Sequence, residues 1–406
     1  MKNTFGASIE LLWTRRFGTF WFASLLSNIG TWVQQVAQPW LLLSLGASPF
    51  LMGLDTFALG APVWFLTLVG GALADSADRR TVIAKFQSIQ MLCPILLVLL
   101  LLFSMVSPWM VIMLSLVIGV TDALSMPSFQ SIVPSIVEHK QIASGLALNS
   151  TQFNLSRILG PAIAGVLLVS VGAVGCFVVS AISYVPFILV ALWILPRREI
   201  SSTVNVVLNH KLILANVEKI SHIPLLRGAL LTVFSTSLFC APLITFIPII
   251  IKNSFHGNAG HFSIAVGLFG VGGLLGAIIL LFVDVKRDRR YISSGFASIY
   301  GIVLILVALN SWFWGLSILL IFGGVAMSVS NISANTILQV NTPSLFRGQA
   351  VSLYMLAMRG GLSIGSLLTG LSVSLIGAEK ALLINGALAL IIQLIVGREW
   401  MRSALP

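Results

Sequence analysis

Long apolar runs, each of about twenty residues or more, recur along the whole chain and are separated by short breaks that carry most of the charges. Only 9% of the residues are charged and 57% are hydrophobic, whereas soluble domains carry roughly 25% charged residues. A surface with so few charges has to face lipid, where only helices and closed barrels satisfy the backbone. The runs lack the alternating pattern of barrel strands. The sequence therefore predicts an all-α membrane protein.

Twelve of these runs are predicted to span the membrane, in two sets of six. The predicted spans are 17–45, 49–73, 81–104, 108–134, 142–170 and 173–195, then 224–251, 260–283, 291–309, 312–334, 346–376 and 379–397. We accordingly expect an N-terminal six-helix bundle over 1–195, a cytoplasmic linker over 196–222 and a C-terminal six-helix bundle over 223–406. The linker mixes apolar and charged residues, so it forms either an amphipathic helix on the membrane surface or a flexible connection.

The positive charges predict an orientation. All 23 lysines and arginines except Lys252, Lys380, Arg157 and Arg359 fall at the N-terminus, the C-terminus, or in or next to the even-numbered loops. Cytoplasmic loops of membrane proteins carry an excess of Lys and Arg, so both termini are expected in the cytoplasm. The anionic inner membrane surface also accounts for the net charge of +11 without a nucleic-acid partner.

The two predicted halves resemble each other in sequence. At a shift of 205 residues, Gly160, Gly165 and Gly172 match Gly365, Gly370 and Gly377, and at a shift of about 210 residues Asp78-Arg79-Arg80 matches Asp288-Arg289-Arg290. The glycine match gives each half a glycine-rich fifth span, and the Asp-Arg-Arg match gives each half a basic turn after its second span. A six-plus-six duplication is typical of secondary transporters, whose substrate site lies near the midplane between the halves.

Two motifs carry a family resemblance. Gly70-Gly-Ala-Leu-Ala-Asp-Ser-Ala-Asp-Arg-Arg80 resembles the loop signature of the major facilitator superfamily and lies, as in that family, between spans two and three. It departs from the signature at Asp78, where the family has glycine, and at Ser76, a usual arginine. Asn154–Gly165 is similar to the fifth span of the branch that contains bacterial siderophore and macrolide exporters. The resemblance implies the major facilitator fold, a monomer, transport by alternating access and a direction of export.

The first motif implies a cytoplasmic latch. Asp75, Asp78, Arg79 and Arg80 would hold the two halves together when the protein is open to the outside, since a carboxylate at a helix end pairs with a helix N-terminus or an arginine. The alternative is a cluster that only sets the topology. In the second motif, Gly160 and Pro161 predict a bend, because proline removes one backbone hydrogen bond of the helix.

Four charges lie well inside predicted spans, away from the span ends, and are candidates for proton coupling or another intramembrane role. They are Asp55, Asp122, Arg157 and Arg359. Asp55 and Arg157 are expected at a similar depth toward the outside, close enough to interact; alternatively, Asp55 faces water. Asp122 has no obvious arginine at its depth, and such a buried carboxylate could carry a proton across. Its alternative role is a structural hydrogen bond.

A stripe of amides and an indole on the first span is the main candidate lining of a substrate cavity. Asn28, Trp32 and Gln35 follow the i, i+4, i+7 spacing of one helix face, and Gln38 lies one turn further. The family resemblance adds spans seven and ten, which contain Phe239, Phe246, Asn331 and Asn335. Amides with aromatic rings suit uncharged or zwitterionic amphipathic solutes. Hydrogen bonding between helices would explain any single one of these residues equally well.

Other classes of function are disfavoured by what the sequence lacks. It contains no nucleophile–base set, no metal-ligand spacing and no phosphate-binding loop, which argues against an enzyme, a metal or cofactor site and an ATP-driven pump. The leading prediction is a proton-coupled exporter of small amphipathic molecules, such as drugs or siderophores, in a bacterial inner membrane. An importer or facilitator with the same fold and a non-transporting membrane sensor are the alternatives.

Overall fold

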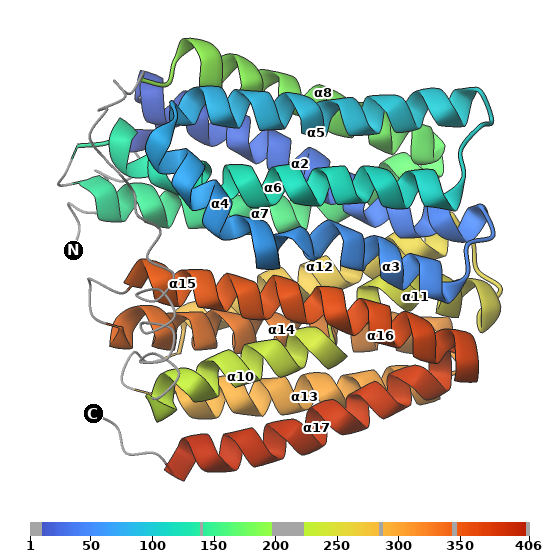
Figure 1. The fold of residues 1–406 in the computed structure, drawn as a ribbon. Coiled ribbons are helices and arrows are strands. Elements are labelled where there is room, and N and C mark those ends of the chain that lie inside the picture. The colour runs from blue at the N-terminus through green and yellow to red at the C-terminus, as the bar shows by residue number, and fades with distance from the viewer. Residues whose placement is uncertain (1–9, 139–140, 197–222, 284–286, 343–346, 403–406) are drawn as a thin grey trace. The chain divides into compact units, whose positions relative to one another are not determined.

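The computed structural model of the chain describes residues 10–138, 141–196, 223–283, 287–342 and 347–402. Within these ranges all regular secondary structure is helical and no strand occurs, which confirms the all-α prediction (Figure 1). The predicted amphipathic linker helix falls in 197–222 and lies outside the described residues.

The helices follow one another along the chain with short connections. In order they are α2 (Arg15–Ser44), α3 (Pro49–Gly60), α4 (Pro62–Ser76), α5 (Arg79–Leu102), α6 (Pro108–Ile136), α7 (Ile142–Ser170) and α8 (Gly172–Trp193), then α10 (Pro224–Phe239), α11 (Leu243–Asn253), α12 (Ala259–Leu281), α13 (Arg289–Leu309) and α14 (Phe313–Asn341), and finally α15 (Arg347–Met355), the π-helical turn η3 (Leu356–Gly360), α16 (Gly361–Ile376) and α17 (Ala378–Arg402).

The helices belong to two compact units. Unit 1 consists of Met1–Leu41 and Pro62–Leu208, and unit 2 consists of Leu42–Ala61 and Asn209–Pro406. The short helix α3 therefore belongs with unit 2, although α2 and α4 on either side of it belong mainly to unit 1. The half boundaries expected at 195 and 223 stay a prediction.

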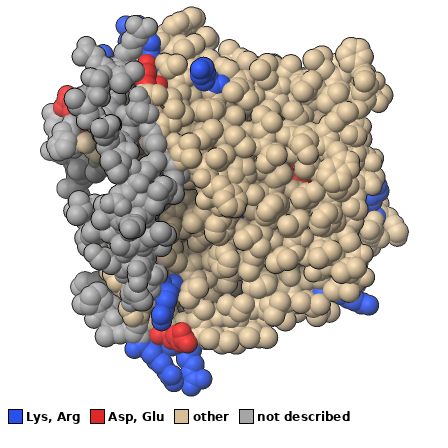
Figure 2. All heavy atoms as spheres, in the orientation of Figure 1, with Lys and Arg blue, Asp and Glu red and all other residues tan. Residues whose placement is uncertain are grey.

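Eleven stretches of the described chain are long and apolar enough to cross a membrane. These eleven stretches correspond to the second to twelfth expected spans. The first expected span, α2, is long enough with 30 residues, but its amide stripe lowers its mean hydropathy. The outer faces of both units fit lipid, with large apolar side chains such as Leu99 and Ile302 each 45% exposed. In Figure 2 few Lys, Arg, Asp or Glu atoms interrupt the surface of the described residues.

The second expected span is broken in the middle. α3 ends at Gly60, Ala61 forms a turn, and Pro62 begins α4. α3 packs against α16 so closely that a Cβ at Gly370 would lie 2.7 Å from the carbonyl oxygen of Pro49. α4 instead packs against α6 in unit 1, where a Cβ at Gly70 would lie 2.6 Å from the carbonyl oxygen of Ala123. Proline is well placed at this break, because it has no backbone N–H to donate and the first turn of α4 requires none.

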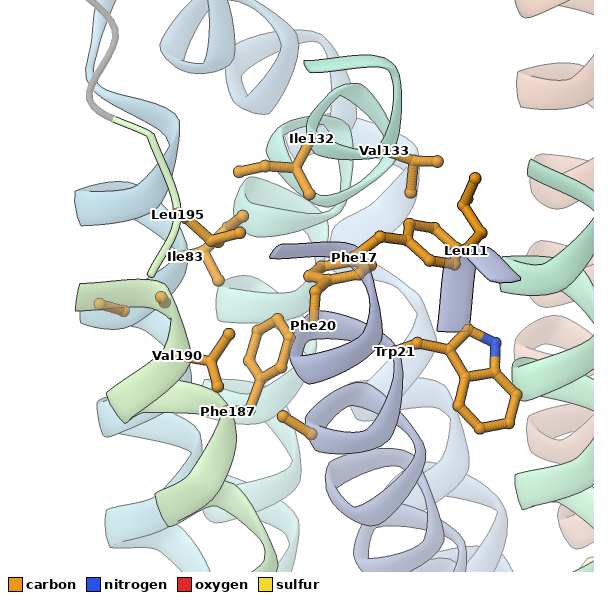
Figure 3. Close-up of a cluster of buried hydrophobic side chains, with 13 residues drawn as sticks. Leu11, Phe17, Phe20, Trp21, Ile83, Ile132, Val133, Phe187, Val190 and Leu195 are labelled. Atoms are coloured by element: carbon orange, nitrogen blue, oxygen red, sulfur yellow. The ribbon is translucent and has the colours of Figure 1, made fainter. Parts of the chain in front are cut away.

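Unit 1 is held by an aromatic core. Phe20 and Phe187 are fully buried and point toward one another from α2 and α8, with ring centroids 5.7 Å apart (Figure 3). Phe129 of α6 stacks on Phe187 at 4.8 Å. In unit 2 the corresponding anchor is Trp400, whose indole N–H donates to the carbonyl oxygen of Leu225 at 2.9 Å. The burial of such rings accounts for much of the packing energy of each unit.

The sequence repeat at the third span of each half has the same geometry in both units. Asp78 caps the N-terminus of α5, and the Nε of Arg80 donates to its carboxylate at 3.0 Å. Asp288 caps α13 in the same way, and the Nε of Arg290 donates to it at 2.9 Å. The Nη1 of Arg80 then reaches the carbonyl oxygen of Leu192 near the end of α8. Likewise, the Nη1 of Arg290 donates to the carbonyl oxygen of Trp400, near the end of α17, at 3.2 Å. The repeated Asp-Arg-Arg turn is therefore a brace between the third and sixth expected spans of each half.

The brace in unit 2 predicts a pH-dependent contribution to stability. Burial would raise the pKa of the Asp288 carboxyl, but the hydrogen bonds and the positive charge of Arg290 hold that pKa below its ordinary value of 3.8. The stabilisation is therefore present above about pH 4 and lost as the pH falls through the lowered pKa. We expect Asp288→Asn to reduce the free energy of unfolding by about 2 kcal/mol near neutral pH.

The measurement is thermal unfolding of both proteins in detergent. The difference in melting temperature between the wild type and Asp288→Asn should narrow as the pH is lowered from about 7 to about 3. A difference that stays constant over this range would show that the charge of Asp288 contributes nothing beyond its role as a cap.

Candidate functional site

A cation and two aromatic rings meet where α2 and α7 touch in unit 1. The guanidinium carbon of Arg157 lies over the indole of Trp32, 5.9 Å from the ring centroid. Phe153, one turn before Arg157 on α7, meets the same indole edge to face at 6.4 Å. The two helices approach this closely because Gly160 has no side chain: a Cβ there would collide with the Cβ of Trp32 and lie 3.2 Å from the carbonyl oxygen of Ile29.

The predicted polar stripe of α2 divides into two parts. Asn28 and Trp32 are half-buried and Gln35 is exposed, so this part remains open along one face of the helix. Gln38 is buried, and its side-chain nitrogen donates to the hydroxyl of Ser115 in α6 at 2.6 Å. The hydrogen bond favours an interhelical role for Gln38, whereas Asn28, Trp32 and Gln35 stay candidates for contact with a solute.

A buried set of amides beside the stripe was missed by the sequence analysis. Gln34 accepts a hydrogen bond from Ser180 of α8 at 3.0 Å, and Ser27 donates to Gln87 of α5 at 3.2 Å. Gln87 also donates to Gln90 at 3.1 Å. The signal available in the sequence was the pair of glutamines three residues apart in an otherwise apolar run. These bonds tie α2 to its neighbours and leave the open face of α2 to the other residues.

Asp122 lies half-buried on α6. It is close enough to Tyr184 to interact with it electrostatically, and the buried Tyr184 hydroxyl lies 3.2 Å from the hydroxyl of Thr31 on α2. Thr31 immediately precedes Trp32, over which Arg157 lies. The carboxylate and the guanidinium of unit 1 are thus connected to adjacent residues of one helix.

Asp55 does not face water in a loop, because it lies in α3 and is only 5% exposed. Arg157 lies thirteen residues before the end of α7, about 20 Å of helix, whereas Asp55 lies six residues after the start of α3. The two helices belong to different units, so the expected common depth and the interaction of Asp55 with Arg157 stay a prediction.

The eleventh expected span contains a local change of helix type around Arg359. This residue belongs to the π-helical turn Leu356–Gly360 between α15 and α16. Such turns inside longer helices are frequent at functional sites. Directly after the turn, Gly361 packs on α10, where a Cβ would lie 3.0 Å from the carbonyl oxygen of Phe234. By contrast, α7 continues through Gly160 and Pro161 to Ser170 without such a turn.

The candidate cavity residues of unit 2 differ in exposure. Phe246 is fully buried, which favours packing over contact with a solute, while Phe239 is half-buried at the end of α10. Asn335 accepts a hydrogen bond from Gln339 at 3.1 Å. The side-chain oxygen of Asn331 is buried in α14 with no hydrogen-bond partner among the described residues. Of the four, Asn331 has the strongest reason to bind a polar atom from outside the protein.

The predicted cytoplasmic latch is only partly described. The side chain of Asp75 lies outside the described residues. Arg79 donates to the carbonyl oxygens of Ala74 and Ser131 within unit 1, and Asp78 and Arg80 form the brace of α5. These bonds show what the residues do inside unit 1, and a latch between the halves stays a prediction. No group of three potential metal ligands occurs in the described ranges.

Comparison with known proteins adds independent evidence. The family model described as transmembrane secretion effector matches residues 8–404. The staphyloferrin A transporter of Staphylococcus aureus is 25% identical over 90% of this chain and 92% of its own length. Macrolide efflux protein A of Streptococcus pyogenes is 22% identical over 94% of this chain and 95% of its own length.

Solved structures give the same fold. The nucleoside transporter NupG superposes with a TM-score of 0.77 at 13% identity, covering 95% of this chain and all of that one. A bacterial homologue of the lysosomal transporter Spinster reaches 0.72 at 14% identity, covering 96% and 98%. The family and these relatives are transporters and not enzymes, and the chain is a multi-pass membrane protein.

Proposed function

Because the chain belongs to the transmembrane secretion effectors of the major facilitator superfamily, we propose that it exports small amphipathic organic molecules, siderophores or macrolides among them, in exchange for protons. Export proceeds by alternating access in a bacterial inner membrane, with both termini in the cytoplasm and the protein as a monomer. Relatives whose names specify a siderophore and a macrolide support the substrate class.

One observation carries the proposal: the carboxylate of Asp122 is linked through Tyr184 to the helix α2, which bears the open polar face. Asp122 interacts with Tyr184, which contacts Thr31, next to the half-buried indole of Trp32. Asp122 is the proton-binding group of the proposal, because a carboxyl group can take up and release a proton, and Asn28, Trp32 and Gln35 are the contacts for the solute.

The test uses energised inverted membrane vesicles that contain the protein. A panel of a cationic dye, a macrolide and a catechol siderophore is offered with and without a protonophore. We expect uptake of at least one member into these vesicles, because their inside corresponds to the outside of the cell, and we expect the protonophore to abolish it. Vesicles without the protein are the control. Uptake that needs no gradient would indicate a facilitator, and uptake only into right-side-out vesicles an importer.

A further inference from the structure

Arg157 lies deep within its helix, which is an unusual position for a charged side chain. It is the one basic side chain of the described part of unit 1 that lies more than two turns from either end of its helix. Charges at such depth are costly in hydrocarbon, and they face a protein interior or a water-filled path. The side chain is half-buried rather than enclosed, so solvent or a solute reaches it.

The surroundings of Arg157 are suited to a ligand with one anionic group and one aromatic or apolar group. The guanidinium carbon lies over the indole of Trp32, 5.9 Å from the ring centroid, and an arginine carries five N–H donors. Five donors allow an arginine to keep contacts within the protein and still hold a carboxylate. Trp32 and Phe153 supply aromatic surface, and Asn28 and Gln35 lie on the same face of α2.

We propose that Arg157, which lies over the indole of Trp32, binds the carboxylate of an amphipathic anion, so that the preferred substrates carry at least one carboxyl group beside an aromatic or apolar body. The assignment rests on the proposed function and narrows its substrate class. A carboxylate is the anionic group of the proposal, because the planar donor fork of an arginine can hold its two oxygens with two parallel hydrogen bonds.

Binding of a matched pair of probes tests the proposal with the purified full-length protein in detergent. 1-Naphthaleneacetate and 1-naphthaleneacetamide have the same shape and differ in the carboxylate. Affinities are obtained from the rise in melting temperature as each probe is titrated. We expect the acid to bind wild-type protein about tenfold more tightly than the amide, the effect of one charge-assisted contact.

Variants test whether Arg157 is the source of the preference for the acid over the amide. Arg157→Gln should bind both probes equally, and Arg157→Lys should keep part of the preference through its charge. Arg227→Gln, at an exposed arginine near the start of α10, removes the same group elsewhere and should leave the tenfold ratio unchanged. If Arg157→Gln fails to fold, Arg157→Lys and the wild-type ratio still decide the question.

The outcomes separate this proposal from the proposed function. Equal affinities for the two probes in the wild type, no binding of the acid, or a preference that survives in Arg157→Gln would each overturn the carboxylate site. Should a neutral macrolide still be taken up by energised vesicles, the transport function would stand without it. An acid preference that depends on Arg157 in a protein that transports nothing would leave the site in place and remove the proposed function.

Discussion

Asp122→Asn is expected to reduce proton-driven uptake into energised vesicles to the level seen with a protonophore. Asparagine has the size of aspartate but cannot take up a proton, so the substrate cycle loses its link to the gradient. The contact between the hydroxyls of Tyr184 and Thr31 does not involve the side chain of Asp122. The variant should therefore still bind substrate and still exchange it across the membrane when both sides contain it.

The comparison that makes this result specific is a second carboxylate outside the site. Glu379 at the start of α17 accepts a hydrogen bond from Ser254 at 2.9 Å on the exposed surface of unit 2. Glu379→Gln should retain gradient-driven uptake, and Asp122→Glu should restore part of it because a carboxyl group is present again. Uptake by Asp122→Asn that remains sensitive to the protonophore would place the coupling group elsewhere.

Gly365→Leu is expected to prevent assembly of unit 2, with loss of most monodisperse protein after extraction. A Cβ at this position of α16 would overlap the carbonyl group of Leu238 and lie 2.9 Å from its Cα. The atoms are backbone, so a rotamer change cannot relieve the overlap and α10 and α16 must separate. Overpacking of this kind costs about 1–3 kcal/mol even where side chains can move, and more here.

An open glycine provides the matched control. Nothing lies within 4 Å of a Cβ built at Gly267 in α12. Gly267→Leu should fold as well as the wild type or better, since leucine has the higher helix propensity. Size-exclusion chromatography of both variants from equal membrane samples makes the measurement. Equal recovery of Gly365→Leu and Gly267→Leu would show that α10 and α16 are not in close contact in the folded protein.

The glycine pair also shows how far the internal repeat extends. Gly160 and Gly365, which match at a shift of 205 residues, each lie against the first helix of their half: Gly160 against α2 and Gly365 against α10. Asp78 and Asp288 likewise cap equivalent helices. A sequence repeat that recurs as the same contact in both units supports duplication more strongly than composition alone.

What the sequence determined by itself is the solvent and therefore the class of fold. With so few charges, lipid had to cover the surface, and lipid admits only structures whose backbone is internally bonded. Helical class, family and internal repeat followed from local or periodic patterns: apolar run length, the loop signature at Gly70–Arg80 and paired glycines. Each pattern is contained in a short segment, so no knowledge of the packing was needed.

Only the tertiary structure decided which polar groups face one another. Sequence spacing put Gln38 on the same stripe as Trp32, but the bond to Ser115 makes it an interhelical contact. The contact of Arg157 with the indole of Trp32 joins segments far apart in the chain, and so does the link from Asp122 through Tyr184 to Thr31. The second span is likewise divided into α3 and α4, which pack against different distant helices. A helical period fixes the face of a residue but not its neighbour. The partner helix is chosen by close packing, here where glycines let backbones meet, and that choice depends on the whole fold.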